Sequence, residues 1–248
     1  MLHSLAQNVE DLALDEQFFR GQVGGVFVEM GALDGVTGSV SCSFERAFNW
    51  SGVLIEANPA MCELLQRHRP RATRLCTAVS SNGEPVRFQK GKFTTTFGDV
   101  SQMDPAFRHK FHSSHQPHIQ VPSAPLGQLL RMVGVAYVDL FVLDVEGSEL
   151  RVLRTMDWSL PVRVWCIEVD LAGGSNNGTL AELMTSKGYR QVQWDAGTDL
   201  QTSPASASAL AVRAGIVHKL SHANQLWVWG GSWTPSKYAW RQYVHRDY

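Results

Sequence analysis

Short runs of consecutive apolar residues recur along the chain, and most of them do not alternate with polar positions. A run that is apolar on both faces is typical of a strand in a parallel sheet that helices cover on both sides. Runs of this kind predict strands at residues 26–30, 53–55, 75–79, 138–143 and 162–169.

Segments in which apolar residues follow a helical spacing lie between several of these strands. They cover residues 8–20, 38–48, 59–68, 126–133, 148–156 and 179–187. Strands that alternate with helices predict an α/β fold with a doubly wound, mostly parallel sheet and right-handed crossovers. Two later runs, 189–194 and 225–229, predict an antiparallel strand pair that closes the sheet and makes it seven-stranded.

Charge and composition exclude some classes of partner. The 248 residues carry 22 Lys and Arg against 23 Asp and Glu, so the sequence predicts no basic surface for nucleic acid or for an anionic membrane. No apolar stretch approaches the ~18 residues of a membrane span, and acidic residues interrupt the N-terminal segment where a signal peptide needs an apolar core. We therefore expect a soluble, cytoplasmic protein.

The four cysteines stand far apart in the sequence and form no Cys-x-x-Cys pair. Three of them lie in apolar or helix-like surroundings, and metal sites and redox motifs require closer spacing. We interpret all four as reduced, buried thiols: Cys42, Cys62, Cys76 and Cys166.

A glycine-containing turn follows the strand at 26–30. Gly31 and Gly35 stand where a ligand would lie against the backbone and where the turn needs positive φ angles. The next strand ends in Glu56, about 20 residues after Gly35, which is the spacing of an acid that binds ribose hydroxyls. The two features together predict a site for an adenosine-containing cofactor.

The acids near this turn discriminate between cofactors. A nicotinamide cofactor calls for Gly-x-Gly-x-x-Gly, and here Ala32, Leu33 and Asp34 follow Gly31. Carboxylates at Glu29 and Asp34 would repel a pyrophosphate but attract the sulfonium and ammonium groups of S-adenosylmethionine. A nicotinamide-dependent oxidoreductase stays open as an alternative, as does a structural domain in which Glu29 and Glu56 only cap strands.

A resemblance to a known family rests on several segments in the same order along the chain. Residues 139–150, DLFVLDVEGSEL, resemble the DVEG-E signature of the FkbM family of S-adenosylmethionine-dependent methyltransferases. Further matching segments are FVEMGALDG at 27–35, LIEANP at 54–59, VPSAPLGQLL at 121–130 and IEVD at 167–170. The ordered match spans about residues 5–230, and its wording is most similar to a eukaryotic branch that includes Star-like proteins.

The resemblance implies a Rossmann-like class I methyltransferase fold and one methyltransferase domain over residues 1–248. Within it we expect an N-terminal helix in 1–22, a cofactor-binding core in 23–170, and C-terminal strands with a tail in 171–248. It also implies S-adenosyl-L-methionine as the cofactor, with the ribose at Glu56. The residues that we expect to bind the cofactor are Glu29, Gly31, Asp34, Gly35, Glu56 and Asp144. Many members have Lys where this chain has Val142, and Asn or Phe where it has Leu33, so a substrate contact differs.

Carboxylates also follow the strands at 138–143 and 162–169. The carboxyl ends of parallel strands meet at one edge of a sheet, and alternate residues share a face. We therefore expect four side chains to converge, those of Asp144, Glu146, Glu168 and Asp170. They form a general base or hold Mg²⁺, and we favour the metal-free arrangement with Asp144, Glu146 and Glu168 as catalytic residues. Glu149 is interpreted as favourable to the N-terminus of the next helix, and the same structural role stays open as an alternative for Glu146.

The predicted function is O-methylation of a hydroxyl group on a small-molecule or glycan acceptor. A catalytically silent interaction protein with the methyltransferase fold stays open as an alternative. Four histidines that recur every third residue are interpreted as part of a solvated or lid loop rather than as a metal site: His109, His112, His115 and His118. They lie in an insertion at 89–120 that we expect to shape substrate access.

Overall fold

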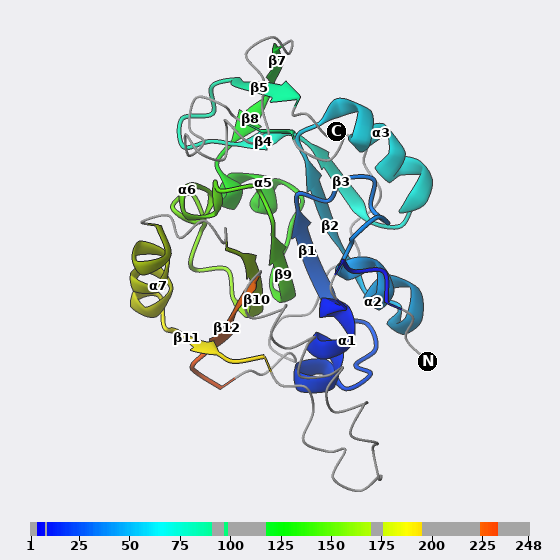
Figure 1. The fold of residues 1–248 in the computed structure, drawn as a ribbon, viewed down its shortest axis with the longest axis vertical. Coiled ribbons are helices and arrows are strands. Elements are labelled where there is room, and N and C mark those ends of the chain that lie inside the picture. Colours follow the sequence, from blue (N-terminus) through cyan, green and yellow to red (C-terminus); the bar gives the residue numbers. More distant parts are fainter. Residues whose placement is uncertain are drawn as a thin grey trace, which may run out of the picture.

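A seven-stranded sheet forms the centre of the molecule, with the strand order β3–β2–β1–β9–β10–β12–β11 (Figure 1). The computed structural model describes residues 4–7, 9–90, 97–98, 118–169, 176–194 and 224–232. The strands are β1 (Val26–Met30), β2 (Ser51–Glu56), β3 (Thr73–Cys76), β9 (Val138–Leu143), β10 (Val162–Glu168), β11 (Tyr189–Val192) and β12 (Asn224–Trp229). The first five of these pair in parallel, whereas β12 is antiparallel to both β10 and β11. The predicted doubly wound sheet and its closing pair are confirmed.

Helices cover both faces of this sheet (Figure 1). One face packs against α1 (Glu10–Leu14), the π-helical turn η1 (Asp15–Phe19), α2 (Ser41–Phe48) and α3 (Pro59–His68). The other face packs against α5 (Leu126–Met132), α6 (Glu149–Leu153) and α7 (Asn176–Ser186). Neighbouring strand residues point to opposite faces, so Leu140 joins the first core and Phe141 the second. This double burial is why the strands are apolar throughout.

Helix α3 begins and ends where the sequence predicts. Asn58 is its N-cap, and its side-chain oxygen accepts a hydrogen bond from the Ala60 amide. Pro59 occupies the first helical position, where its missing N–H leaves no backbone partner unsatisfied. The helix follows β2 directly and returns the chain to β3, so it lies against the edge of the sheet that carries these two strands.

The chain between β3 and α5 leaves the main sheet. Residues 75–79 are not one strand, as the apolar run predicted, because the run is interrupted at Thr77, whose hydroxyl donates to the carbonyl of Pro122. After this break, β4 (Ala78–Val79) pairs with β8 (Ser123–Ala124), and β5 (Val86–Lys90) pairs with β6 (Phe97–Gly98) and β7 (His118–Val121). Since β4 follows β3 directly, these small sheets lie beyond the carboxyl edge of the main sheet, at the top of Figure 1. Most of the 89–120 insertion lies outside the described residues.

The reading of the cysteines as four thiols is wrong for two of them. Cys62 on α3 and Cys76 at the end of β3 form a disulfide, with their Cα atoms 5.7 Å apart. Their separation of 14 residues matches no short motif; they meet because α3 packs back against the strand that follows it. Cys42 and Cys166 are free and buried, as predicted. Disulfides are rare in cytosolic proteins, so the bond weighs against the expected cytoplasmic location.

No helix among the described residues is long and apolar enough to cross a membrane.

Candidate active site

The predicted site residues gather at the carboxyl edge of the sheet. Strands β2 and β3 lie on one side of β1, and β9 and β10 lie on the other, so the strand order reverses between β1 and β9. Ligands of open α/β sheets bind outside such a switch point. Gly31 follows β1 there, Glu56 ends β2, Asp144 follows β9 and Glu168 ends β10.

Gly31 stands at the centre of this edge. Its φ is 83°, and a Cβ built on it would lie 1.8 Å from the carbonyl oxygen of Asp144. The sequence predicted that a side chain here would enter the space of the cofactor; the structure shows that it would first meet the backbone after β9. The Gly31 backbone itself is exposed.

We call the loop after β1, residues 31–41, the β1 turn. Glu56, at the end of β2, holds the first part of this turn. Its carboxylate accepts hydrogen bonds from the amides of Leu33 at 2.8 Å and Asn58 at 2.7 Å. Burial, together with the negative charge of Asp144, raises the pKa of the Glu56 carboxyl, although its amide partners oppose the shift. Leu33 has a φ of 49°, a left-handed conformation that its bond to Glu56 helps to maintain.

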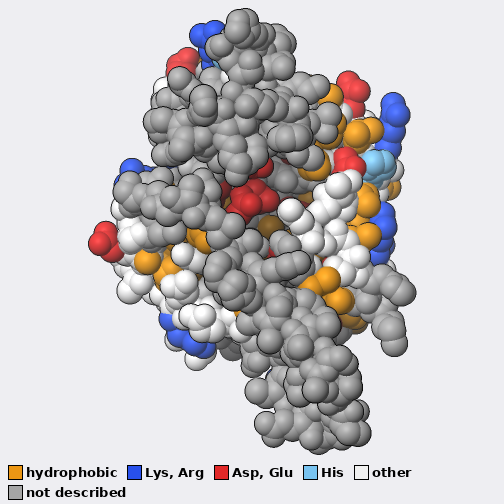
Figure 2. All heavy atoms as spheres, viewed as in Figure 1, with side chains coloured by type: hydrophobic (Ala, Val, Ile, Leu, Met, Phe, Trp, Pro, Cys, Tyr) orange, Lys and Arg blue, Asp and Glu red, His pale blue; other side chains and the backbone are white. Residues whose placement is uncertain are grey.

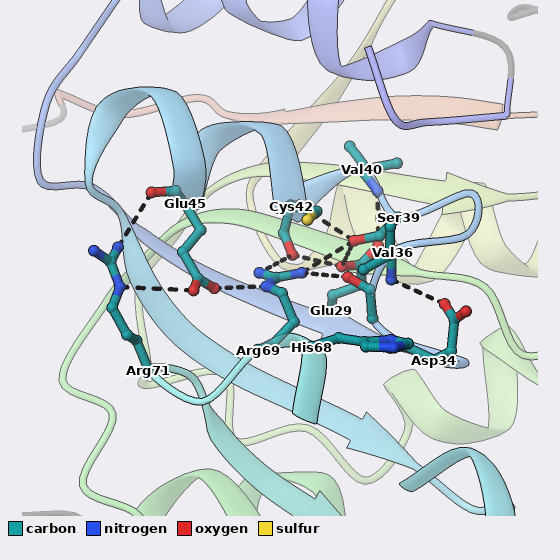
Figure 3. A network of polar contacts seen from close by, with 12 residues as sticks. Glu29, Asp34, Val36, Ser39, Val40, Cys42, Glu45, His68, Arg69 and Arg71 are labelled. Atoms are coloured by element: carbon teal, nitrogen blue, oxygen red, sulfur yellow. Dashed lines mark hydrogen bonds and ion pairs between the residues drawn. The ribbon is translucent and has the colours of Figure 1, made fainter. Parts of the chain in front are cut away.

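Glu29 points into the protein rather than toward the cofactor edge. Its carboxylate is buried and accepts hydrogen bonds from the Ser39 hydroxyl at 2.7 Å, the Val40 amide at 2.9 Å and the Ser41 hydroxyl (Figure 3). These partners form the entry to α2. Glu29 therefore shapes the far end of the β1 turn.

Asp34 also organises the β1 turn. Its carboxylate accepts hydrogen bonds from the amides of Val36 at 2.9 Å and Thr37 at 2.7 Å and from the Thr37 hydroxyl. Burial opposes ionisation, but these hydrogen bonds hold the pKa of Asp34 below its ordinary value. Gly35 follows with a φ of 81°, and a Cβ on it would lie 2.8 Å from both Arg69 Cγ and Leu65 Cδ2. The second glycine thus serves the packing of α3.

Arg69 is the residue of this region that the sequence reasoning missed. It is the C-cap residue of α3, only 2% exposed, and its guanidinium lies among groups of the β1 turn and α2 (Figure 3). Its main partners are 24 to 34 residues distant in sequence. Arg is common near the C-terminal end of a helix because its charge interacts favourably with the helix dipole. No local sequence pattern distinguishes a buried Arg from an exposed one at such a position.

Asp144 and Glu168 form a hydrogen-bonded carboxyl pair across β9 and β10. Burial raises the pKa of Asp144, and burial together with the charge of Asp144 raises the pKa of Glu168 to about 11. Two adjacent carboxylates cannot both ionise cheaply in a partly buried place. The pair therefore favours a state that holds at least one proton.

Glu146 and Glu149 belong to residues 144–149, which we call the β9 turn. Glu146 and Gly147 have φ angles of 55° and 91°, so the backbone reverses sharply after β9. The buried Glu149 carboxylate closes this turn by accepting hydrogen bonds from the amides of Val145 at 3.1 Å and Gly147 at 3.0 Å. Burial raises the pKa of Glu149 to about 7. The negative charge of Glu146 reaches Glu168 and helps to raise the pKa of Glu168.

The described part of this edge offers no metal site. No group of three or more His, Cys, Asp or Glu side chains in the described ranges could hold a metal ion. Asp170, the fourth predicted carboxylate, lies outside those ranges, as do His109, His112 and His115.

Acidic side chains are exposed near the middle of the face drawn in Figure 2, in a hollow of the surface.

Comparison with known families decides the class of protein. A family model described as the methyltransferase FkbM domain matches residues 29–191, a range that includes both turns and all of the predicted site residues.

The chain belongs to the FkbM methyltransferase family. Membership makes the protein a methyltransferase, and its fold implies use of S-adenosylmethionine. The alternative of a nicotinamide-dependent oxidoreductase is thereby set aside. No curated protein matches the chain.

Solved structures with a similar chain path include several methyltransferases. A Methanococcus jannaschii fibrillarin pre-rRNA processing protein has 12% identity and a TM-score of 0.48, over 92% of this chain and 78% of that one. A methyltransferase FkbM from Methylobacillus flagellatus KT has 11% identity and a TM-score of 0.44, over 88% and 48%. A TehB-like SAM-dependent methyltransferase from Corynebacterium glutamicum has 11% identity and a TM-score of 0.42, over 91% and 89%.

Proposed function

We propose that this FkbM-family protein methylates a hydroxyl group of a small-molecule or glycan acceptor. Family membership shows that the protein is a methyltransferase. That the acceptor atom is an oxygen is our inference from the site. The observation that carries it is the carboxyl pair of Asp144 and Glu168 at the switch point of the sheet, where the Asp144 backbone lies next to Gly31. A hydroxyl is a weak nucleophile that gains from a proton acceptor in the transition state.

The residues at this edge fit S-adenosylmethionine. We infer that the methionine end lies against the exposed Gly31 backbone beside the β1 turn and that Glu56 accepts hydrogen bonds from the ribose hydroxyls. The carboxylates of this edge favour a cation and would repel a pyrophosphate. When bound, the cofactor supplies a methyl group already activated on a positively charged sulfur.

Asp144 is placed to take the proton of the acceptor hydroxyl. When a bound cofactor transfers its methyl group to the acceptor oxygen, the Asp144 carboxylate would take up the hydroxyl proton. The pair with Glu168 then holds two protons and is neutral, and it returns one of them to solvent after the product leaves. The positive charge of the donor and the negative charge of the carboxylate disappear together, so charge is balanced across the step. Glu146 contributes to the negative potential around the pair.

A Mg²⁺ ion is the other way to lower the pKa of an acceptor hydroxyl. We favour the metal-free mechanism, in which Asp144 itself takes the proton of the acceptor hydroxyl. Chelation is therefore expected to leave turnover unchanged. Loss of turnover with a chelator and its recovery with Mg²⁺ would support the metal mechanism instead.

The test is transfer of radiolabelled methyl groups from S-adenosylmethionine to pooled acceptors with hydroxyl, carboxyl or amine groups, including glycans. The proposal predicts a product whose label resists mild alkali, because a methyl ether is stable where a methyl ester is hydrolysed to methanol. An alkali-labile label or a methylated nitrogen would contradict it. Cofactor binding without transfer to any pool would instead support the catalytically silent alternative.

A further inference from the structure

The guanidinium of Arg69 connects α3 to the β1 turn through several contacts (Figure 3). Nη1 donates to the Gly35 carbonyl at 2.9 Å and to the Ser39 hydroxyl at 3.2 Å, and Nη2 donates to the Ser41 hydroxyl at 3.1 Å. Nε donates to the Glu45 carboxylate at 2.7 Å. One buried side chain thus fixes the middle and the end of the turn and the first half of α2.

The charges around Arg69 explain why so many polar groups can be buried here. The Ser39 and Ser41 hydroxyls accept from Arg69 and donate to Glu29, so they link the guanidinium to a second buried carboxylate. Glu45 lies on the other side of the guanidinium. Without Arg69, the Glu29 and Glu45 carboxylates would be left without their shared buried cation, which is costly.

Arginine suits this position better than lysine does. Its planar guanidinium has five donors in a fixed arrangement, whereas an ammonium offers three donors from one point. The guanidinium also lies 5.2 Å from the centre of the Phe27 ring, which packs one of its faces. Gly35 leaves room for the Arg69 side chain, since a Cβ there would lie 2.8 Å from Arg69 Cγ.

Helix α3 contacts both ends of the region where the cofactor is expected. At its start, the Asn58 amide donates to Glu56, the carboxylate assigned to the ribose. At its end, the His68 ring donates from Nδ1 to the Asp34 carbonyl at 2.8 Å, next to the Arg69 contacts. The hydrogen bonds of Glu56 do not involve Arg69. The ribose part and the methionine part of the expected cofactor site are therefore held by different contacts.

We propose that Arg69 is a positioning residue that holds the β1 turn in the conformation that receives the methionine end of S-adenosylmethionine. The inference rests on the proposed cofactor site and adds a determinant of its affinity. Arg69 is buried and acts through the turn, without touching the ligand. Removing it loosens the Gly35–Ser41 part of the turn and leaves the Glu56 contacts in place.

The experiment compares two ligands in calorimetric titrations of folded variants. S-adenosylhomocysteine carries both the adenosine and the amino acid portions, whereas 5′-methylthioadenosine lacks the amino acid. Arg69→Met is expected to raise the Kd of S-adenosylhomocysteine at least about tenfold, which corresponds to the loss of a hydrogen bond to a charged group. Its Kd for 5′-methylthioadenosine is expected to stay within about twofold of the wild-type value. Arg69→Lys should fall between wild type and Arg69→Met for the first ligand.

Arg163→Met is the matched control. Arg163 also places its guanidinium 5.2 Å from an aromatic ring, that of Phe19, and donates to the Phe18 carbonyl and the Gln22 side chain, but it contacts neither turn. Its loss should lower the melting temperature without changing either Kd. A purely structural role for Arg69 predicts the same behaviour for Arg69→Met, and that result would overturn the inference.

The remaining outcomes are also decisive. If Arg69→Met does not fold, Arg69→Lys decides, and an unchanged Kd for S-adenosylhomocysteine in that variant overturns the inference. Equal losses of affinity for both ligands would contradict the assignment of Arg69 to the methionine end. If the wild-type protein binds neither ligand, the proposed function fails. If the wild-type protein binds both ligands and the Arg69 variants bind them equally well, only the inference about Arg69 fails.

Discussion

The β1 turn and the β9 turn share a pattern but use their acids differently. Each follows a buried parallel strand, contains at least one glycine with positive φ and leads to a helix. Around the β1 turn, the carboxylates of Glu29, Asp34 and Glu56 all accept hydrogen bonds from amides or hydroxyls of the turn. In the β9 turn, Glu149 does this, whereas Asp144 bonds to Glu168.

The comparison separates acids that build a shape from acids that are available for chemistry. A carboxylate that accepts several backbone hydrogen bonds is fixed in place, and its proton affinity is reduced by those bonds. A carboxyl pair that shares a proton has a raised proton affinity and can change its protonation state during a reaction. We infer that the β1 turn holds the cofactor and that the β9 turn supplies the proton acceptor.

The largest effect is expected where the two turns meet. Gly31→Ala should lower the free energy of unfolding by at least about 3 kcal/mol, because the new Cβ needs the space of the Asp144 carbonyl in addition to the cost of a positive φ. Gly38→Ala is the control: Gly38 has a φ of 71° but no atom within 4 Å of a new Cβ, so about 1 kcal/mol is expected. Urea unfolding measures both, and equal losses would show that the contact with Asp144 is unimportant.

The disulfide supports the β1 side of the site through α3. Reducing Cys62–Cys76 should lower the free energy of unfolding by about 3 kcal/mol, the value for a closed loop of this length. Thermal unfolding with and without reductant measures the effect, and the double variant Cys62→Ser, Cys76→Ser should not respond to reductant. Alkylation of the unfolded, unreduced protein at four thiols instead of two would show that the bond is absent.

Glu56→Ala tests the β1 turn alone. The variant should bind S-adenosylhomocysteine more weakly by about 1 to 3 kcal/mol, because both the ribose contact and the bond that holds Leu33 are lost. In contrast to Arg69→Met, it should also weaken 5′-methylthioadenosine, which carries the ribose. Calorimetry of the folded variant measures this, and unchanged affinity for both ligands would remove Glu56 from the cofactor site.

Much of the fold follows from the sequence because its strands are buried on both faces. β1 and β9 were predicted to their last residue, as was α3 with its Asn-Pro start. The break at Thr77 was missed because a change of sheet within an apolar run depends on a partner strand that lies 45 residues away in sequence. The disulfide was missed for the same reason: its cysteines meet only after α3 has packed.

The sequence predicted where the candidate site lies better than it predicted the contacts of the individual site residues. The position of Gly31, Glu56, Asp144 and Glu168 at one edge follows from strand order. The hydrogen bonds of Glu29 and Asp34 depend on how the β1 turn folds back, and no spacing rule reveals that their carboxylates face the loop. Arg69 has no local signature because its partners are on α2 and in the turn.

The central claim is that Asp144 takes a proton while the β1 turn holds the cofactor. Its most direct test is Asp144→Asn, with turnover on the identified acceptor and calorimetric affinity for S-adenosylhomocysteine measured on the same folded sample. We expect turnover to fall about 10²- to 10⁴-fold, the usual contribution of a general base, with the affinity within a few-fold of wild type. Full turnover in Asp144→Asn would contradict the claim.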